Sequence, residues 1–220
     1  MCHKPGMSAC GGGSCGIQKV RERERVAVQA AVDAAYPGRV WRPDPLVGSP
    51  LSRGRVRALA AGLEALLPVR AFMREATIEG DCDWIYLLAG LHSDCLFERS
   101  AGLAAGGDSL RSEETYLRIG FSRLGPQVTL QETRFFLEKD ELGLTIEERP
   151  CLGVEDRRLQ LIVKGTQGFL QHQKLVTLDM AYLVEPLEGA SGSEEATTQR
   201  WSFLFEATPP AACRLVALDG

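Results

Sequence analysis

Residues 116–148 read YLRIGFSRLGPQVTLQETRFFLEKDELGLTIEE. Val, Ile, Thr, Phe and Tyr are frequent in this run, which is typical of β-strands. Two turn signals divide it, Gly125-Pro126 and Lys139-Asp140-Glu141. These gaps are too short for a crossover helix, so we expect the segments on either side of each turn to pair as antiparallel hairpins.

Later segments have a similar composition, and the sequence predicts that the sheet continues through them. In residues 157–164, Leu159, Leu161 and Val163 alternate with polar residues, although Ile162 interrupts the polar side. Such alternation predicts a strand with one packed face and one mostly solvated face. The expected strands are Tyr116–Arg123, Gln127–Glu138, Leu142–Glu148, Arg157–Lys164, Phe169–Val184, Arg200–Ala207 and Cys213–Leu218, with residues 165–168 as a turn.

Two helices are expected before the sheet. Residues 17–36 contain no Pro or Gly and are rich in Ala, Arg, Glu, Gln and Val, and Pro37-Gly38 ends this run. A second helix is expected to start at Ser49-Pro50, because serine can cap backbone N–H groups and proline suits the first turn. Its apolar residues recur at three- and four-residue steps before Pro68: Val56, Leu59, Ala60, Leu63, Leu66 and Leu67.

These elements predict an α+β fold in which N-terminal helices pack on a six- to seven-stranded antiparallel sheet that could curl toward a barrel. Residues 1–16 contain glycines and cysteines but few large apolar side chains, so we expect a flexible segment there. Residues 17–220 are expected to form a single domain, with a helical part over 17–112 and the sheet over 113–220.

Composition restricts the class of protein. Hydrophobic residues make up 45% of the 220 residues and charged residues 25%, close to the average for a globular chain, so independent folding is expected. The formal net charge of -4 argues against nucleic acid as a partner, because phosphate-binding proteins usually have a basic face. We find no run of about 18 apolar residues and no apolar leader, so we expect a cytoplasmic protein without membrane insertion.

The first candidate site is the N-terminal group Cys2, His3, Cys10 and Cys15. Thiolates with an imidazole are suitable ligands for zinc, and thiolates for an iron-sulfur cluster. The spacing matches neither the C-x2-C pairs of zinc ribbons nor the C-x4-C-x2-C run of plant-type ferredoxins. Two other interpretations therefore remain open, namely cysteines without a ligand role and a redox disulfide.

A second candidate site combines Asp81 and Asp83 with His92 and Asp94. Residues two apart in a strand share a face, so these side chains could converge on Mn, Fe or Zn if the two segments pair as strands. Cys95 could instead form a thiolate–imidazolium pair with His92, which makes these two the candidate catalytic residues. The alternative interpretation is an ordinary turn and a hydrogen-bonded histidine.

Two further groups have structural explanations. The glutamates of the expected sheet could act as acid and base: Glu132, Glu138, Glu147 and Glu148. Basic residues lie close to them in sequence, so cross-strand ion pairs on a solvated face explain these glutamates better. Three aromatic residues at two-residue steps would form one strand face, which we expect in the core: Trp201, Phe203 and Phe205.

The sequence contains no P-loop, no G-x-S-x-G elbow, no H-E-x-x-H helix and no strand-to-helix G-x-G-x-x-G motif. The leading hypothesis is therefore a non-catalytic accessory or binding protein that engages another protein or a cofactor, with a metal or iron-sulfur centre on the N-terminal cysteines. One alternative is a thiol- or metal-dependent enzyme built on His92, Cys95 and the nearby aspartates. Another is a structural subunit of a larger assembly.

Overall fold

A computed structural model describes residues 21–41, 50–74, 84–90, 110–140, 143–151, 153–190 and 199–205. Helices and a β-sheet are both present in these ranges, which confirms the α+β class. Among the described helices, none has both the length and the apolar character needed to cross a membrane.

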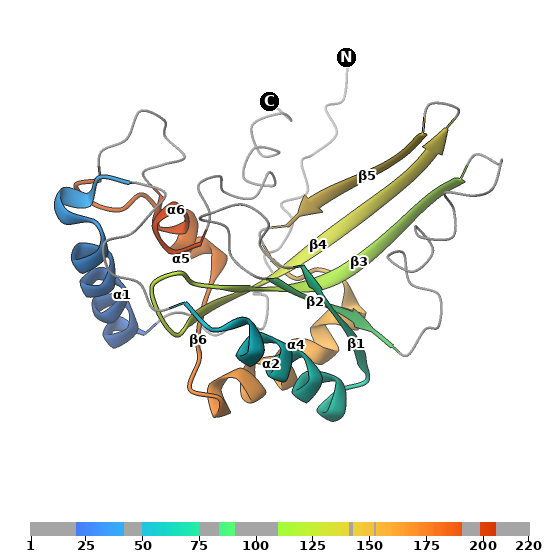
Figure 1. The fold of residues 1–220 in the computed structure, drawn as a ribbon, viewed down its shortest axis with the longest axis horizontal. Helices are drawn as coiled ribbons and strands as arrows, with labels where there is room; N and C mark the ends of the chain where they lie inside the picture. Colours follow the sequence, from blue (N-terminus) through green and yellow to red (C-terminus); the bar gives the residue numbers. More distant parts are fainter. Residues whose placement is uncertain are drawn as a thin grey trace, which may run out of the picture.

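The sheet has six strands and is mixed and open (Figure 1). Five strands follow the order β1-β2-β3-β4-β5 and pair antiparallel. The turn signals predict the β3-β4 and β4-β5 hairpins among these pairs. The sixth strand pairs in parallel with β4, because the chain returns to β4 through a helical crossover, so the prediction of a purely antiparallel sheet is wrong. The prediction of a barrel is also wrong, since β1 and β5 are the two ends of the pairing order. The strands are β1 (Val69–Arg74), β2 (Trp84–Ala89), β3 (Leu110–Phe121), β4 (Gln127–Asp140), β5 (Gly143–Pro150) and β6 (Val176–Leu178).

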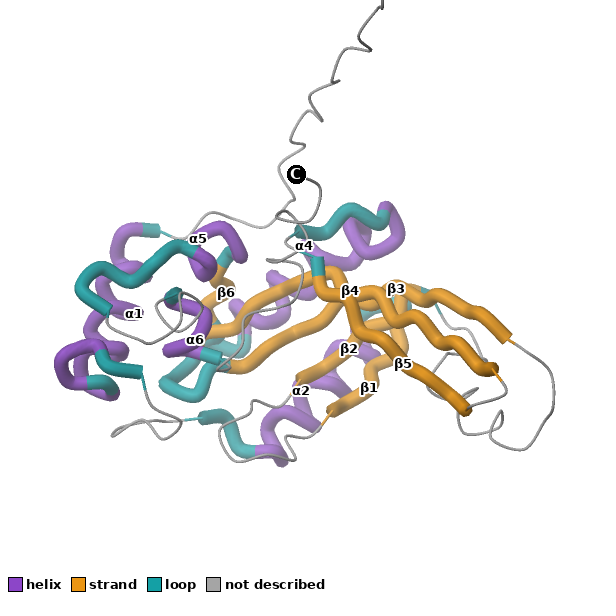
Figure 2. Tube along the Cα trace, turned by 90° about the horizontal axis from the view of Figure 1, so that it is seen from above, coloured by secondary structure: helices purple, strands orange, loops and turns teal. Residues whose placement is uncertain are grey.

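Helices cover both faces of the sheet rather than one (Figures 1 and 2). On one face, α2 (Arg53–Leu66) and α4 (Arg157–His172) pack on Ile85, Leu117 and Leu130. The other face meets α1 (Glu22–Ala35), α5 (Met180–Val184) and α6 (Arg200–Leu204). A short 3-10 helix, η1 (Pro37–Arg39), follows α1 at the Pro-Gly signal. Helices and strands are therefore interleaved along the chain, and the expected division at residue 112 is not observed.

The predicted strand Arg157–Lys164 is wrong, because these residues form the first half of α4. Asp156 caps this helix and accepts hydrogen bonds from the backbone N–H groups of Arg158 (2.7 Å) and Leu159 (3.4 Å). Leu161, which fitted the strand alternation, is 83% exposed. The buried side follows helical spacing and includes the residue that interrupted the alternation: Leu159, Ile162, Val163, Thr166 and Leu170.

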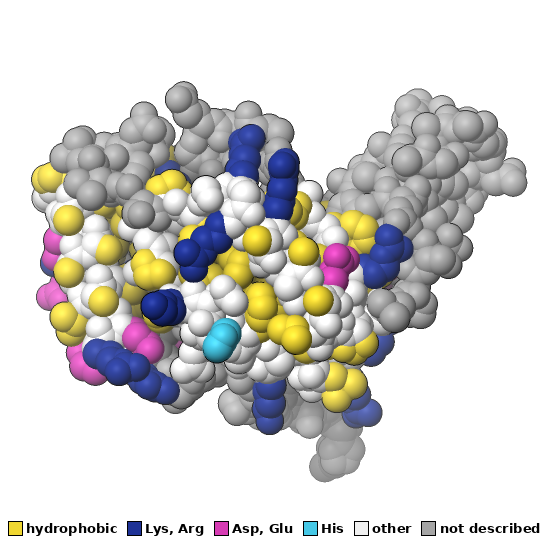
Figure 3. Space-filling view, turned by 60° about the horizontal axis from the view of Figure 1, so that its bottom comes forward, with side chains coloured by type: hydrophobic (Ala, Val, Ile, Leu, Met, Phe, Trp, Pro, Cys, Tyr) yellow, Lys and Arg dark blue, Asp and Glu magenta, His cyan; other side chains and the backbone are white. Residues whose placement is uncertain are grey.

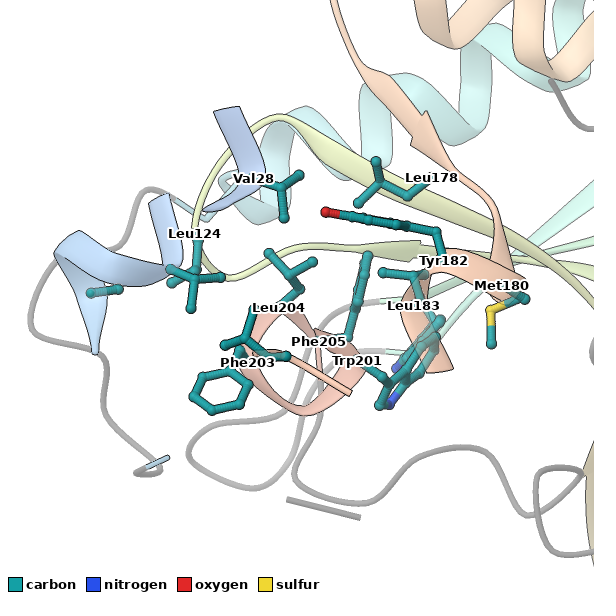
Figure 4. Close-up of a cluster of buried hydrophobic side chains, with 14 of the residues drawn as sticks. Val28, Leu124, Leu178, Met180, Tyr182, Leu183, Trp201, Phe203, Leu204 and Phe205 are labelled. Carbon is teal, nitrogen blue, oxygen red and sulfur yellow. The ribbon is translucent and has the colours of Figure 1, made fainter. Parts of the chain in front are cut away.

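The predicted strand Phe169–Val184 divides into the end of α4, the short β6 and α5. The described part of the predicted strand Arg200–Ala207 is α6, in which Trp201 and Phe205 stack one helical turn apart with ring centres at 5.0 Å. These aromatic residues belong to the core, as expected. Figure 4 shows Trp201 and Phe205 beside Leu183 and Tyr182 of α5. Residues 213–218 lie outside the described ranges.

Candidate ligand-binding face of the sheet

The site residues predicted from sequence cannot be placed. Both metal groups and the thiol pair lie outside the described residues: Cys2, His3, Cys10, Cys15, Asp81, Asp83, His92, Asp94 and Cys95. Within the ranges that the structure describes, no group of three or more His, Cys, Asp or Glu side chains could hold a metal ion.

A row of three buried residues crosses the centre of the sheet on the face that α1, α5 and α6 partly cover. The strand register places Tyr86 of β2 opposite Arg118 of β3, and Arg118 opposite Gln131 of β4. Neighbouring strands hold these residues at fixed spacing, and alternation directs all three to the same face. Their exposed fractions are 1%, 5% and 0%, so two strongly polar side chains lie inside the protein.

The guanidinium of Arg118 lies over the ring of Trp84, with Cζ 3.3 Å from the ring centre. Trp84 also stacks on Trp201 of α6, with ring centres 6.0 Å apart. A Cβ atom added at Gly120 would lie 2.2 Å from the Trp84 ring, so glycine is needed at this position. The cation and the indole ring therefore form one packed unit on the sheet.

Glu148 of the edge strand β5 extends across the sheet to this unit. Its Oε1 atom lies 3.3 Å from Nη1 of Arg118 and accepts hydrogen bonds from the hydroxyl groups of Tyr86 (3.0 Å) and Thr133 (3.4 Å). The Glu148 side chain is 18% exposed and that of Arg118 is 6% exposed. Solvent and salt therefore screen this ion pair less than a pair on the surface.

Gln131 differs from Tyr86 and Glu148 in the hydrogen bonds of its side chain. Neither its amide oxygen nor its amide nitrogen has a hydrogen-bond partner among the described residues, although the residue is fully buried. A primary amide can donate two hydrogen bonds and accept two. Burying such a group without a partner costs about 1–3 kcal/mol. The amide therefore marks a point on the sheet at which a polar group would be bound favourably.

A cluster of aromatic rings lies next to the polar row on the same face of the sheet. The Tyr116 ring meets Phe72, Tyr86 and Phe135 edge to face, with ring centres 6.1, 6.3 and 5.5 Å apart. The hydroxyl of Tyr116 donates to Glu114 at 2.5 Å. An apolar wall with a few polar groups at its centre is the usual composition of a small-molecule site.

Glu132 stabilises the fold on the opposite face of β4. It is fully buried, and its Oε2 atom accepts hydrogen bonds from the backbone N–H groups of Glu155 (2.7 Å) and Asp156 (2.8 Å). Its Oε1 atom lies 2.9 Å from Nε of Arg134. Glu132 therefore fixes the loop that starts α4, and both of its oxygens are engaged.

The described ion pairs of these glutamates differ in part from the sequence interpretation. Glu132 pairs with Arg134 and Glu147 with Arg149 (2.7 Å), in both cases along one strand rather than between strands. Residues two apart in a strand share a face, which permits this pairing. Only Glu148 forms a cross-strand pair among those described, and it lies on the polar row. The side chain of Glu138 lies outside the description.

Cys151 is the one cysteine in the described ranges, and it follows β5. Its burial and the nearby Glu132 carboxylate raise the pKa of the thiol to about 11. The thiolate is the nucleophilic form of cysteine, so this thiol is a poor nucleophile at neutral pH.

Sequence reasoning missed Arg118 and Gln131. Both occupy polar positions of alternating strands, a pattern that normally indicates a solvated face. The signal that could have indicated burial is Gly120, because a glycine inside a strand often marks the close approach of another group. The group that approaches Gly120 is the ring of Trp84 of β2.

Comparison of the chain with protein-family models, with curated proteins and with solved structures gave no match.

Proposed function

We propose that this protein is a non-catalytic binding protein that encloses a cofactor or small ligand on the Tyr86–Arg118–Gln131 face of its sheet. The unpartnered, fully buried amide of Gln131 carries this proposal. The ligand would present a donor and an acceptor side by side, as a carboxamide or a heterocyclic base does, because this pattern complements the amide.

The surroundings of the amide support binding rather than a purely structural role. Arg118 is already charge-balanced by Glu148, so the site favours an uncharged polar group over a second carboxylate. The buried rings of Tyr86 and Tyr116 give the polar row apolar surroundings, which suits a ligand that is apolar apart from one polar edge. The proposed ligand is therefore a flat, largely apolar molecule with one amide-like edge.

Native mass spectrometry of protein purified without denaturation tests this proposal. We expect a bound mass on the wild-type chain, and its loss in Gln131→Met, which keeps the volume of the side chain and removes both polar atoms. Gln160→Met is the matched control, because Gln160 is an exposed residue of α4. Benzamide and nicotinamide serve as added probes in saturation-transfer NMR. If wild type and Gln131→Met bind both probes equally and carry the same copurified molecules, the proposal is wrong.

The N-terminal thiols remain a separate proposal that rests on sequence alone. We propose that Cys2, His3, Cys10 and Cys15 hold zinc or an iron-sulfur cluster through which the protein engages a partner protein. Metal analysis and a visible absorption spectrum of anaerobically purified protein, repeated after deletion of residues 1–16, test this proposal. An unchanged metal content in the truncated chain would contradict it.

A further inference from the structure

A cavity lies away from the sheet face, between the start of α1, the end of α4 and β6. Its volume is about 210 Å³, and its polar lining includes Arg21, Arg23, Gln167 and Lys174. Pockets for drug-sized ligands usually measure about 300–1,000 Å³. This cavity therefore suits one polar group of a ligand rather than a whole large molecule.

The lining of the cavity is cationic. Arg21 and Arg23 approach from α1, and Lys174 approaches from the turn after α4. Among the described residues, none of these three cations forms an ion pair with a carboxylate. The single acidic side chain of the lining, Glu24, accepts a hydrogen bond from the backbone N–H of Arg21 at 2.8 Å.

We propose that this cavity binds the phosphate group of a small molecule. Three cations that form no ion pair within the described ranges, against one carboxylate, leave an excess of positive charge, which matches the charge of about −1.5 to −2 that a phosphate monoester carries at neutral pH. Guanidinium groups fit phosphate with two parallel hydrogen bonds, and an ammonium group adds a compact charge. The amide of Gln167 supplies a neutral donor on the same lining.

Figure 3 shows the underside of the molecule, where, among the described residues, Lys and Arg side chains are more numerous than acidic ones and are interspersed with apolar side chains. Opposite charge near a cavity favours the approach of an anion.

Isothermal titration calorimetry of the full chain at low salt tests the proposal with inorganic phosphate and inorganic pyrophosphate as probes. Citrate at equal ionic strength is the control anion. We expect saturable binding of at least one phosphate probe and weaker binding of citrate. Comparison of the two phosphate probes shows whether the cavity accepts a monophosphate or a diphosphate group.

Two variants locate the binding. Arg23→Gln and Lys174→Gly are each expected to weaken phosphate binding about tenfold, the equivalent of one charge-assisted hydrogen bond. Lys174 has a φ of 62°, which glycine adopts without strain, so Lys174→Gly is expected to fold and to melt at a higher temperature than wild type. Lys164→Gln removes a cation of α4 that does not line the cavity and should leave the affinity unchanged.

Three results would overturn the proposal. They are the absence of saturable binding for both phosphate probes, equal affinity for citrate, and unchanged affinity in both variants. Gln131→Met provides a further check, because that residue belongs to the sheet face. Loss of phosphate binding in Gln131→Met would place the anion on the sheet and refute a site at α1 and α4, whereas unchanged binding supports two independent sites.

Discussion

Replacing Gln131 by methionine tests whether the buried amide is a binding group or an element of the core. Methionine nearly conserves the volume of glutamine and is accommodated readily in packed interiors. The substitution therefore removes two polar atoms that have no partner among the described residues, without opening a cavity. The expected result is a more stable protein that has lost its ligand.

The magnitude follows from the cost of the unpaired amide. Burial of an unsatisfied polar group costs about 1–3 kcal/mol, and Gln131 is fully buried. Gln131→Met should then raise the free energy of unfolding by about 2 kcal/mol. For a chain of this length, such a change corresponds to a rise in Tm of roughly 4–8 °C.

Urea unfolding followed by tryptophan fluorescence measures this change, because Trp84 and Trp201 are both buried near the polar row. The protein should first be refolded from urea and dialysed, so that no small molecule remains bound. Gln160→Met is the control, since its amide already donates to the carbonyl oxygens of Val154 (3.1 Å) and Glu155 (3.4 Å), and a slight loss of stability is expected. A loss of 1 kcal/mol or more in refolded Gln131→Met would refute the reasoning, because the amide would then be satisfied inside the chain itself.

Three substitutions and one chemical modification test the packing and the titrating groups. Gly120→Ala should lower the free energy of unfolding by more than about 2 kcal/mol, because the new Cβ would lie 2.2 Å from the ring of Trp84. Gly168 of α4 has open space around an added Cβ, so Gly168→Ala should raise the free energy of unfolding by about 0.5–1 kcal/mol. Equal urea midpoints for Gly120→Ala and Gly168→Ala would contradict these opposite expectations. Asp156→Ala should cost about 1–2 kcal/mol at pH 7 through loss of the α4 cap. The hydrogen bond from the Arg158 guanidinium lowers the pKa of Asp156 in the folded protein. The stabilisation by the Asp156 carboxylate is therefore complete above the ordinary pKa of 3.8 and is lost as the pH falls through the folded pKa. Urea unfolding at pH 7 and pH 3 should show that the difference in unfolding free energy between wild type and Asp156→Ala is smaller at pH 3. Because the pKa of Cys151 is about 11, iodoacetamide at pH 8 should alkylate this thiol about 100-fold more slowly in the folded protein than in urea-unfolded protein. Peptide mapping measures the two rates, and equal rates would contradict the raised pKa.

The hairpins of β3, β4 and β5 could be predicted from sequence because their determinants are local. Gly125-Pro126 lies between β3 and β4, and the observed register continues directly from this turn. The helix α2 was also predictable from its apolar spacing, although it begins after Ser52 rather than at residue 49. Turn residues and periodicity act within a few positions, so a single sequence contains this information.

The second half of the chain was harder to assign because short amphipathic segments satisfy two periodicities. In α4, Leu159 and Val163 are compatible both with strand alternation and with a helical stripe. Gly165 is typical of a turn, but here it lies inside the helix, where an added Cβ would be 2.6 Å from Leu67 of the segment after α2. Close packing between α2 and α4, rather than turn formation, therefore accounts for this glycine.

The candidate site could not be predicted because polar residues have no local signal for burial. Arg118 and Gln131 are 13 positions apart in the chain, and only the antiparallel register makes them neighbours. Arg118 is covered by Trp84 of β2, which stacks on Trp201 of α6, and both tryptophans come from distant parts of the chain.

The sequence by itself determined the hairpin order, the two N-terminal helices and the class of the fold, because turns, caps and apolar spacing act over short distances. Tertiary structure alone decided that both faces of the sheet are covered and that β6 runs parallel to β4. It also decided that the polar side of β3 and β4 is buried. Burial depends on what packs against a residue, and for Arg118 the packing ring comes from Trp84 of β2, a segment that the neighbours of Arg118 in sequence do not specify.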